Sequence, residues 1–168
     1  VPTFWGYKRQ DGSVGIRNEI WVINTVGCIN KSVEKIVLSA QEKYREDIEM
    51  GNIDGIFTFA HPYGCSQLGG DLENTQKILA GLVRHPNAAG VLVVGLGCEN
   101  NQLRDFKKVI GNSNDNRVKF LNLQDVEDED TEALTRIGSL IEYAKGFKRE
   151  EVAVSKLKIG LKCGGSDS

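Results

Sequence analysis

Apolar residues are spaced along the chain in two alternating ways. Short runs rich in apolar residues predict strands, and the middle runs, which are β-branched and nearly unbroken in apolar character, predict strands buried on both faces. Between these runs, apolar residues recur at i, i+3, i+4 and i+7, which is the spacing of an amphipathic helix. The strands are expected at 20–25, 55–59, 90–96, 118–121 and 157–161, and the helices around 33–40, 72–82, 103–110 and 134–144.

This alternation of strands and helices predicts an α/β fold. Parallel neighbours are joined by right-handed helical crossovers, so we expect a doubly wound, mostly parallel, five-stranded, Rossmann-like sheet with helices on both faces. Asp71 is expected to cap the N-terminus of the second helix, and Gly111 to end the third.

The N-terminal residues predict a separate small element. Asp11 and Gly12 form a hairpin-turn pair, so we expect a β-ribbon appendage at 1–19 and a three-layer α/β domain at 20–168. The chain begins with Val1 rather than Met and ends on "CGGSDS" with no helix after it. We therefore expect it to be a fragment of a longer protein.

Composition and charge narrow the class of protein. Lysine and arginine number 21 against 23 acidic residues, and there is no basic run, which argues against a nucleic-acid partner. No apolar run approaches the ~20 residues of a membrane span, and no signal peptide is present, so a cytoplasmic protein with no membrane partner is expected. Four cysteines without a secretory signal predict reduced thiols or metal ligands rather than disulfides.

The four cysteines, Cys28, Cys65, Cys98 and Cys163, each follow a predicted strand. The turns after parallel strands lie along one edge of a sheet, where doubly wound folds bind their ligands. Thiolates are soft ligands that suit iron, zinc or an iron–sulfur cluster, although no CxxC spacing occurs here. The alternative for each cysteine is a small, buried hydrophobic residue.

The two histidines are expected at opposite edges of the sheet. His61 follows the second strand, four residues before Cys65, and could be a ligand or a general base; the alternative is a loop histidine bonded to the backbone. His85 comes after a helix that runs back across the sheet, which places it at the far edge. Arg17, just before the first strand, is also expected there.

Two glycine-rich turns offer polar groups to an anion. The sequence "GLGCENNQ" lacks the third glycine of the dinucleotide fingerprint, but its Glu99, Asn100 and Asn101 precede a helix, whose N-terminus favours an anion. The N–H groups of "CGGSDS" could cradle a carboxylate or phosphate, or its glycines could serve the turn alone.

Four longer stretches resemble one enzyme family. "GYKRQDGSVGIRNEIWVINTVGC", "HPYGCSQLGGD", "RHPNAAGVLVVGLGCENNQ" and "LKIGLKCGGSDS" resemble the altronate and galactarate dehydratases, in the same order, over nearly the whole chain. The resemblance implies the middle domain of an iron-dependent sugar-acid dehydratase, which converts a 2,3-dihydroxy acid such as D-altronate to a 2-keto-3-deoxy acid. Galactarate dehydratases and the large subunit of sulfolactate sulfo-lyase share this framework.

The resemblance also implies roles for residues. Iron, as a ferrous ion or an iron–sulfur cluster, would be held by some of the four cysteines; His61 would be a ligand or the proton-transfer base, and Glu99 is a second catalytic candidate. The expected partners are a small sugar acid, the remaining domains of the same chain and, in a homo-oligomer, further copies of it. Because the remaining domains are needed to complete the site, residues 1–168 alone should be inactive. The rival hypothesis is a non-catalytic domain whose loops serve assembly or anion binding. The candidate substrate-binding residues are Ser66, Gln67, Asn100, Asn101, Gly164, Gly165 and Ser166.

Overall fold

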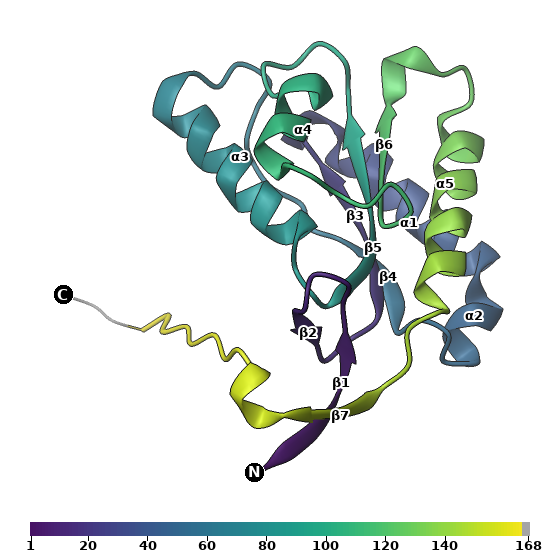
Figure 1. Ribbon diagram of the computed structural model, residues 1–168. Helices are drawn as coiled ribbons and strands as arrows, with labels where there is room; N and C mark the ends of the chain where they lie inside the picture. The colour runs from purple at the N-terminus through teal and green to yellow at the C-terminus, as the bar shows by residue number, and fades with distance from the viewer. Residues whose placement is uncertain (166–168) are drawn as a thin grey trace.

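The core of the molecule is a four-stranded parallel sheet. A computed structural model describes residues 1–165. The strands are β3 (Glu19–Asn24), β4 (Gly55–Thr58), β5 (Ala88–Gly95) and β6 (Val118–Asn122). They lie in the order β4-β3-β5-β6, all parallel (Figure 1). β5 is buried along its whole length because it lies inside the sheet with helices over both faces.

Helices cover both faces of this sheet, which confirms the predicted α/β architecture. They are α1 (Asn30–Lys43), α2 (Arg45–Glu49), α3 (Gly69–Val83), α4 (Leu103–Ile110) and α5 (Glu129–Ala144), with 3₁₀ turns at Gly27–Ile29, Leu123–Asp125 and Val154–Lys156. α1 and α5 pack with Ile20 on one face, and α3 and α4 pack with Trp21 on the other, because neighbouring strand residues point to opposite faces. Gly111 ends α4 as predicted, with φ 77°. Among the described residues, no helix is long and apolar enough to span a membrane.

Segments near both ends of the chain form a second, antiparallel sheet. Its strands are β1 (Thr3–Lys8), β2 (Val14–Gly15) and β7 (Glu150–Ala153), in the order β2-β1-β7. The predicted N-terminal ribbon is confirmed, with a turn at Gly12 (φ 82°) in which Asp11 accepts hydrogen bonds from the backbone N–H and hydroxyl of Ser13 (2.9 and 2.6 Å). Because β7 pairs with β1, the ribbon also includes residues far beyond position 19.

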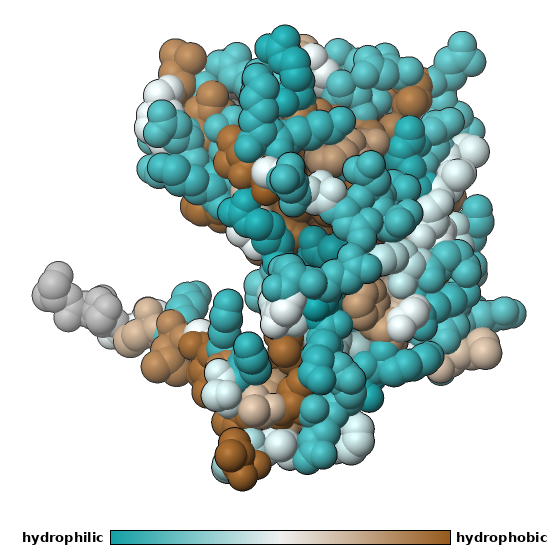
Figure 2. All heavy atoms as spheres, viewed as in Figure 1, coloured by the Kyte–Doolittle hydropathy of each residue, from teal (hydrophilic) through white to brown (hydrophobic). Residues whose placement is uncertain are grey.

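The prediction of a fifth parallel strand at 157–161 is wrong. After α5 the chain pairs as β7 with β1 in the other sheet, and the described residues that follow β7 form no strand. Leu157, Ile159 and Leu161 are exposed, and Figure 2 shows brown apolar spheres along the segment that leads to the grey terminus. These residues alternate with lysine or glycine, a period of two that does not indicate a strand buried on both faces.

Helix α3 differs from its prediction in two details. It begins at Gly69, with Leu68 at the N-cap position, so Asp71 lies within the first turn and is not the cap. Its buried side includes the polar residue Thr75, whereas Ile78 is 56% exposed. The apolar pattern alone would turn Ile78 toward the core and Thr75 toward solvent, because a threonine is counted as a polar, surface residue.

The connections place a topological switch point at the carboxyl ends of the strands. From β3 the chain runs through α1 to β4 on one side, and it returns through α3 to β5 on the other side of β3. This reversal makes a topological switch point between β3 and β5, which is where doubly wound proteins bind their ligands. The loops after β3, β4 and β5 therefore form the region in which to look for a site.

Candidate functional site

The carboxyl ends of three strands carry polar side chains in an otherwise apolar sheet. Asn24, Thr58 and Asn122 are the last residues of β3, β4 and β6. Each has a buried side-chain oxygen, and these are the buried side-chain atoms without a hydrogen-bond partner in residues 1–165. β5 ends in Gly95, where a Cβ would come 2.7 Å from Asn122 Oδ1. Buried side-chain oxygens without partners are thus concentrated at the carboxyl ends of the strands.

Glu99 joins the loops on the two sides of the switch point. Its carboxylate is 1% exposed and accepts hydrogen bonds from the Thr25 hydroxyl (2.6 Å) and from the backbone N–H groups of Leu96 (3.0 Å) and Gly97 (2.7 Å). Burial alone would raise the pKa of Glu99, but these hydrogen bonds outweigh it and hold the pKa below its usual value. Because both oxygens are engaged, the geometry favours a positioning role for Glu99 over direct proton transfer.

Two asparagines predicted to bind substrate also tie loops together. Asn101 is buried and donates to the Thr25 carbonyl oxygen (3.2 Å), while it accepts from the Gln76 amide (3.0 Å). The exposed Asn100 donates from its backbone N–H to the Cys65 carbonyl oxygen (3.0 Å) and from its side-chain amide to the Gln67 backbone carbonyl oxygen (2.9 Å). The loops after β4 and β5 are therefore held against each other.

His61 lies at this edge, as predicted, and its ring is bonded to the backbone. Nε2 lies 3.0 Å from the Asn24 carbonyl oxygen, and Nδ1 accepts from the Tyr63 N–H at 3.3 Å. The carbonyl acceptor requires the proton on Nε2, which leaves Nδ1, with its longer bond, as the nitrogen able to take up a proton. Asn30 donates to the His61 carbonyl (2.9 Å), and Gly27 donates to the Tyr63 carbonyl (2.6 Å), which joins this loop to the one after β3.

Three of the four cysteines lie on the three loops of this edge. All four thiols are exposed, so the alternative of small buried hydrophobic residues is wrong. Cys28 and Cys65 line one open hollow together with Gly64, Ser66, Gln67, Leu68 and Asp71. Cys98 belongs to the neighbouring loop after β5 and does not line that hollow. Within residues 1–165, no three His, Cys, Asp or Glu side chains are close enough to hold a metal ion.

Cys163 does not reach this edge. The expectation depended on the fifth strand, and the segment that replaces it follows β7 at the opposite end of the molecule (Figure 1). Gly164 and Gly165 lie in the same exposed segment, so the structure does not bring them to the other candidates. Ser166 lies outside the described residues.

The opposite edge holds the residues expected there. His85 follows α3 and packs on the Trp21 ring at 5.1 Å between centroids, and its burial lowers the pKa of the imidazole. Arg17 lies just before β3 and pairs with Glu19 and Asp54. These contacts stabilise the fold locally. His85 and His61 thus lie at opposite edges of the sheet, as predicted.

The sequence interpretation missed the residues that organise the loops, Asn24, Thr25, Asn30 and Asn122. A signal was present, because each strand-ending asparagine closes an apolar run, in "IWVIN" and "VKFLN". A polar residue at that position lies where the sheet opens to its ligand, so it deserves the same interpretation as the cysteines that follow.

Together these features define an α/β domain with a network of polar side chains at the switch point of a doubly wound sheet, the position at which folds of this class bind ligands. The family model for the second domain of D-galactarate dehydratase/altronate hydrolase matches residues 6–145, and the chain belongs to this family.

Characterised relatives match the chain over almost its whole length. It is 50% identical over 98% of its length to the altronate dehydratase of Bacillus subtilis (strain 168), and 44% identical over 96% to that of Escherichia coli (strain K12). It is 30% identical over 99% to the (2R)-sulfolactate sulfo-lyase subunit beta of Chromohalobacter salexigens. The chain covers 33%, 32% and 39% of these relatives, or about a third of each. No solved structure matches it.

Proposed function

We propose that this chain forms one wall of the active site of a sugar-acid dehydratase. The reaction removes water from a 2,3-dihydroxy acid to give a 2-keto-3-deoxy acid, with altronate as the first candidate substrate. The observation that carries this proposal is the loop network at the switch point, in a chain half identical to an altronate dehydratase over 98% of its length.

The strand ends suit a substrate rich in hydroxyl groups. The Asn24 and Asn122 side-chain oxygens are buried acceptors without partners in residues 1–165, and hydroxyl groups are the donors that a sugar acid provides. A buried acceptor that gains a donor no longer bears the cost of being unpaired, so these positions would favour binding of a polyol chain. Ser66 and Gln67 line the neighbouring hollow and would add contacts there.

The reaction needs a base, because a C–H group beside a carboxylate is weakly acidic. We assign this role to His61, through Nδ1. Its Nε2–H is fixed on the Asn24 carbonyl, which sets the tautomer and the direction of the ring. A modest shift of the Tyr63 loop would free Nδ1, since catalytic hydrogen bonds often tighten or exchange only when substrate is bound.

Iron, which the family resemblance implies, would be held by Cys28 and Cys65. Both thiols are exposed and line one hollow, and thiolates are soft ligands that suit iron. When bound, iron would supply positive charge that stabilises the negative charge developing on the substrate carboxylate. We place the remaining ligands outside the described residues, because residues 1–165 contain no group of three suitable side chains.

The test is turnover by the complete enzyme, prepared anaerobically and assayed with and without added ferrous iron. D-altronate, galactarate and sulfolactate are supplied separately, and 2-keto acid formation is followed. The sulfolactate arm is included because of the 30% identity to a sulfo-lyase subunit. Turnover of altronate supports the proposal, and turnover of galactarate or sulfolactate alone would reassign the substrate. No 2-keto acid from any of the three would favour a non-catalytic, anion-binding or assembly domain.

A further inference from the structure

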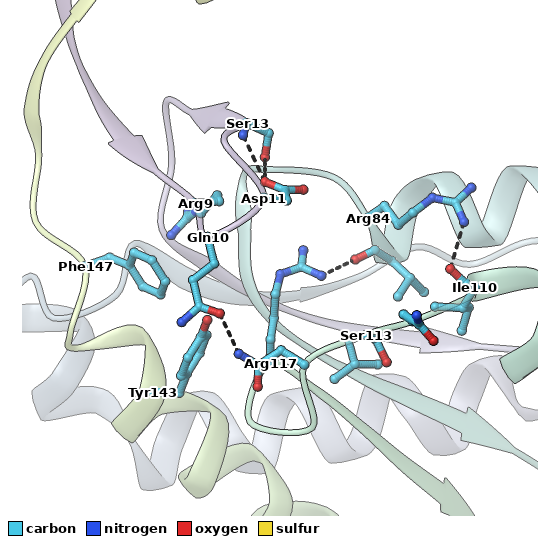
Figure 3. Close-up of a pocket in the computed structure, with 14 residues that line it drawn as sticks. Arg9, Gln10, Asp11, Ser13, Arg84, Ile110, Ser113, Arg117, Tyr143 and Phe147 are labelled. Atoms are coloured by element: carbon cyan, nitrogen blue, oxygen red, sulfur yellow. Dashed lines mark hydrogen bonds between the residues drawn. The ribbon is translucent and has the colours of Figure 1, made fainter.

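A cavity of about 160 Å³ lies at the end of the sheet opposite the candidate active site. It is enclosed by the turn of the β1–β2 hairpin, the end of α3, the loop between α4 and β6, and the end of α5 (Figure 3). Its walls come from four segments that are far apart in the sequence, so the cavity exists only when the chain is folded. Nothing in the proposed dehydration uses this cavity.

The cavity carries an excess of positive charge. Arg9, Arg84 and Arg117 all line it, and the one acidic lining residue is Asp11, whose carboxylate is already engaged by Ser13. Within residues 1–165, none of the three arginines forms an ion pair with a carboxylate. Asp11 acts on Arg9 and Arg117 through its charge without forming an ion pair with either, so three arginines and one carboxylate leave the cavity with net positive charge.

Two of the arginines are held rigidly by the backbone. Arg117 donates to the carbonyl oxygens of Val83, His85 and Ala88, and its side chain extends into the middle of the cavity in Figure 3. Arg9 is 7% exposed and donates to the Arg17 and Pro86 carbonyls and to the Asn18 side chain. A guanidinium has five N–H groups, so three such bonds leave two N–H groups on each side chain without a hydrogen-bond partner in residues 1–165.

The electrostatics favour an anion here. Burial, with the nearby charge of Arg117, lowers the pKa of Arg9 to about 10, and burial also lowers the pKa of Arg117. Both side chains stay protonated at neutral pH, but each is less stable as a cation than it would be in water. A bound anion would offset this penalty, and the planar fork of arginine matches a carboxylate.

The apolar part of the lining indicates an organic anion. Val83, Ile110, Val118 and Phe147 supply apolar wall, which a short carbon chain would cover and a bare inorganic ion would not. We propose that this cavity binds a small organic carboxylate, with the carboxylate group on Arg9 and Arg117 and the carbon chain against the apolar wall. This site does not depend on the proposed dehydratase activity.

The experiment is calorimetric titration of the complete protein with propionate, compared with propionamide and inorganic phosphate. Gln10 lines the cavity, and its side-chain oxygen accepts from the Asn114 amide (2.7 Å). Gln10→Glu keeps this oxygen and the shape of the side chain but adds one negative charge beside the arginines. Gln102→Glu makes the same change at an exposed position at the other end of the sheet and is the matched control.

We expect propionate to bind, propionamide not to bind, Gln10→Glu to weaken propionate at least ~10-fold, and Gln102→Glu to leave it unchanged. A thermal unfolding scan of Gln10→Glu checks that the variant is folded. No propionate binding, equal binding of propionamide or phosphate, or unchanged propionate affinity in folded Gln10→Glu would overturn the proposal. Because no turnover is measured, these outcomes are independent of the dehydratase assay.

Discussion

Replacing Glu99 by glutamine should lower the free energy of unfolding, because Glu99 holds the loops after β3 and β5 together by hydrogen bonds. In the native chain, Oε1 accepts from the Thr25 hydroxyl and the Leu96 N–H, and Oε2 accepts from the Gly97 N–H. The amide of glutamine has only one oxygen, so an NH₂ group must face at least one of these donors. The variant loses a hydrogen bond to a charged acceptor and leaves a donor without its partner.

The size of this effect follows from the number of bonds lost. A hydrogen bond to a charged group contributes about 1.5–3 kcal/mol, so losing one or two predicts that Glu99→Gln lowers the free energy of unfolding by about 2–4 kcal/mol. Urea unfolding of residues 1–168 at neutral pH measures this difference. Glu34→Gln is the matched control, since Glu34 is exposed on α1 and pairs with no other described residue.

The pH dependence gives a second, independent check. The pKa of Glu99 is lowered in the folded chain, so the fold favours the ionised carboxylate. This contribution is fully present above the ordinary pKa of 4.5 and is lost as the pH falls through the lower, folded value. The difference between native and Glu99→Gln chains should therefore shrink at acid pH. A difference at neutral pH no larger than that of Glu34→Gln would refute the role assigned to Glu99.

Three further changes test other parts of the edge. A Cβ at Gly27 would come closer to the His61 carbonyl oxygen than Cβ atoms approach other atoms, so Gly27→Ala should lower the free energy of unfolding in urea by about 1–3 kcal/mol. Gly64→Ala, in open space, should lower it little, and equal effects of the two changes would show that the loop adjusts freely. In the complete enzyme, His61→Ala should lower turnover at least ~10²-fold. His85→Ala removes packing on Trp21 and should mainly lower the free energy of unfolding, by about 1 kcal/mol. The opposite pair of effects would contradict the site assignment. Cys65→Ser should lose bound iron, measured by elemental analysis, with a change in unfolding free energy below about 1 kcal/mol, and retained iron with normal turnover would remove Cys65 from the site.

Local patterns predicted the large sheet and the positions of its loops. The run that became β5 is apolar throughout, as a strand covered on both faces must be, and its turn therefore placed Cys98 at the correct edge. The segment at 157–161 has the composition of a strand. The residues just before it, Glu150–Ala153, pair with β1 at the other end of the chain, and this pairing directs the segment away from the parallel sheet. A local pattern carries no information about that partner.

The same limit applies to the chemistry of the site. Glu99 beside a glycine-rich turn reads as a free carboxylate, yet it is buried and accepts a hydrogen bond from Thr25, 74 residues earlier, across the switch point. For His61 the sequence left a general base and a loop histidine bonded to the backbone as alternatives, and the structure shows the ring bonded to a backbone carbonyl at the end of β3. Residue type and strand position predicted where these groups lie, while their partners were set by the tertiary fold.

The central claim is that substrate binds at the carboxyl edge between β3 and β5, and protection of its thiols from alkylation tests this most directly. The complete enzyme is treated with a thiol-alkylating reagent alone, with saturating D-altronate, or with the corresponding neutral polyol, and each cysteine is quantified by mass spectrometry. Cys98 is exposed on the loop after β5 and is not one of the proposed iron ligands, so altronate should slow its labelling and the polyol should not. Cys163, exposed at the opposite end of the molecule, should be labelled at the same rate in all three samples. Unchanged labelling of Cys98, under conditions in which the enzyme turns over altronate, would contradict the location of the site.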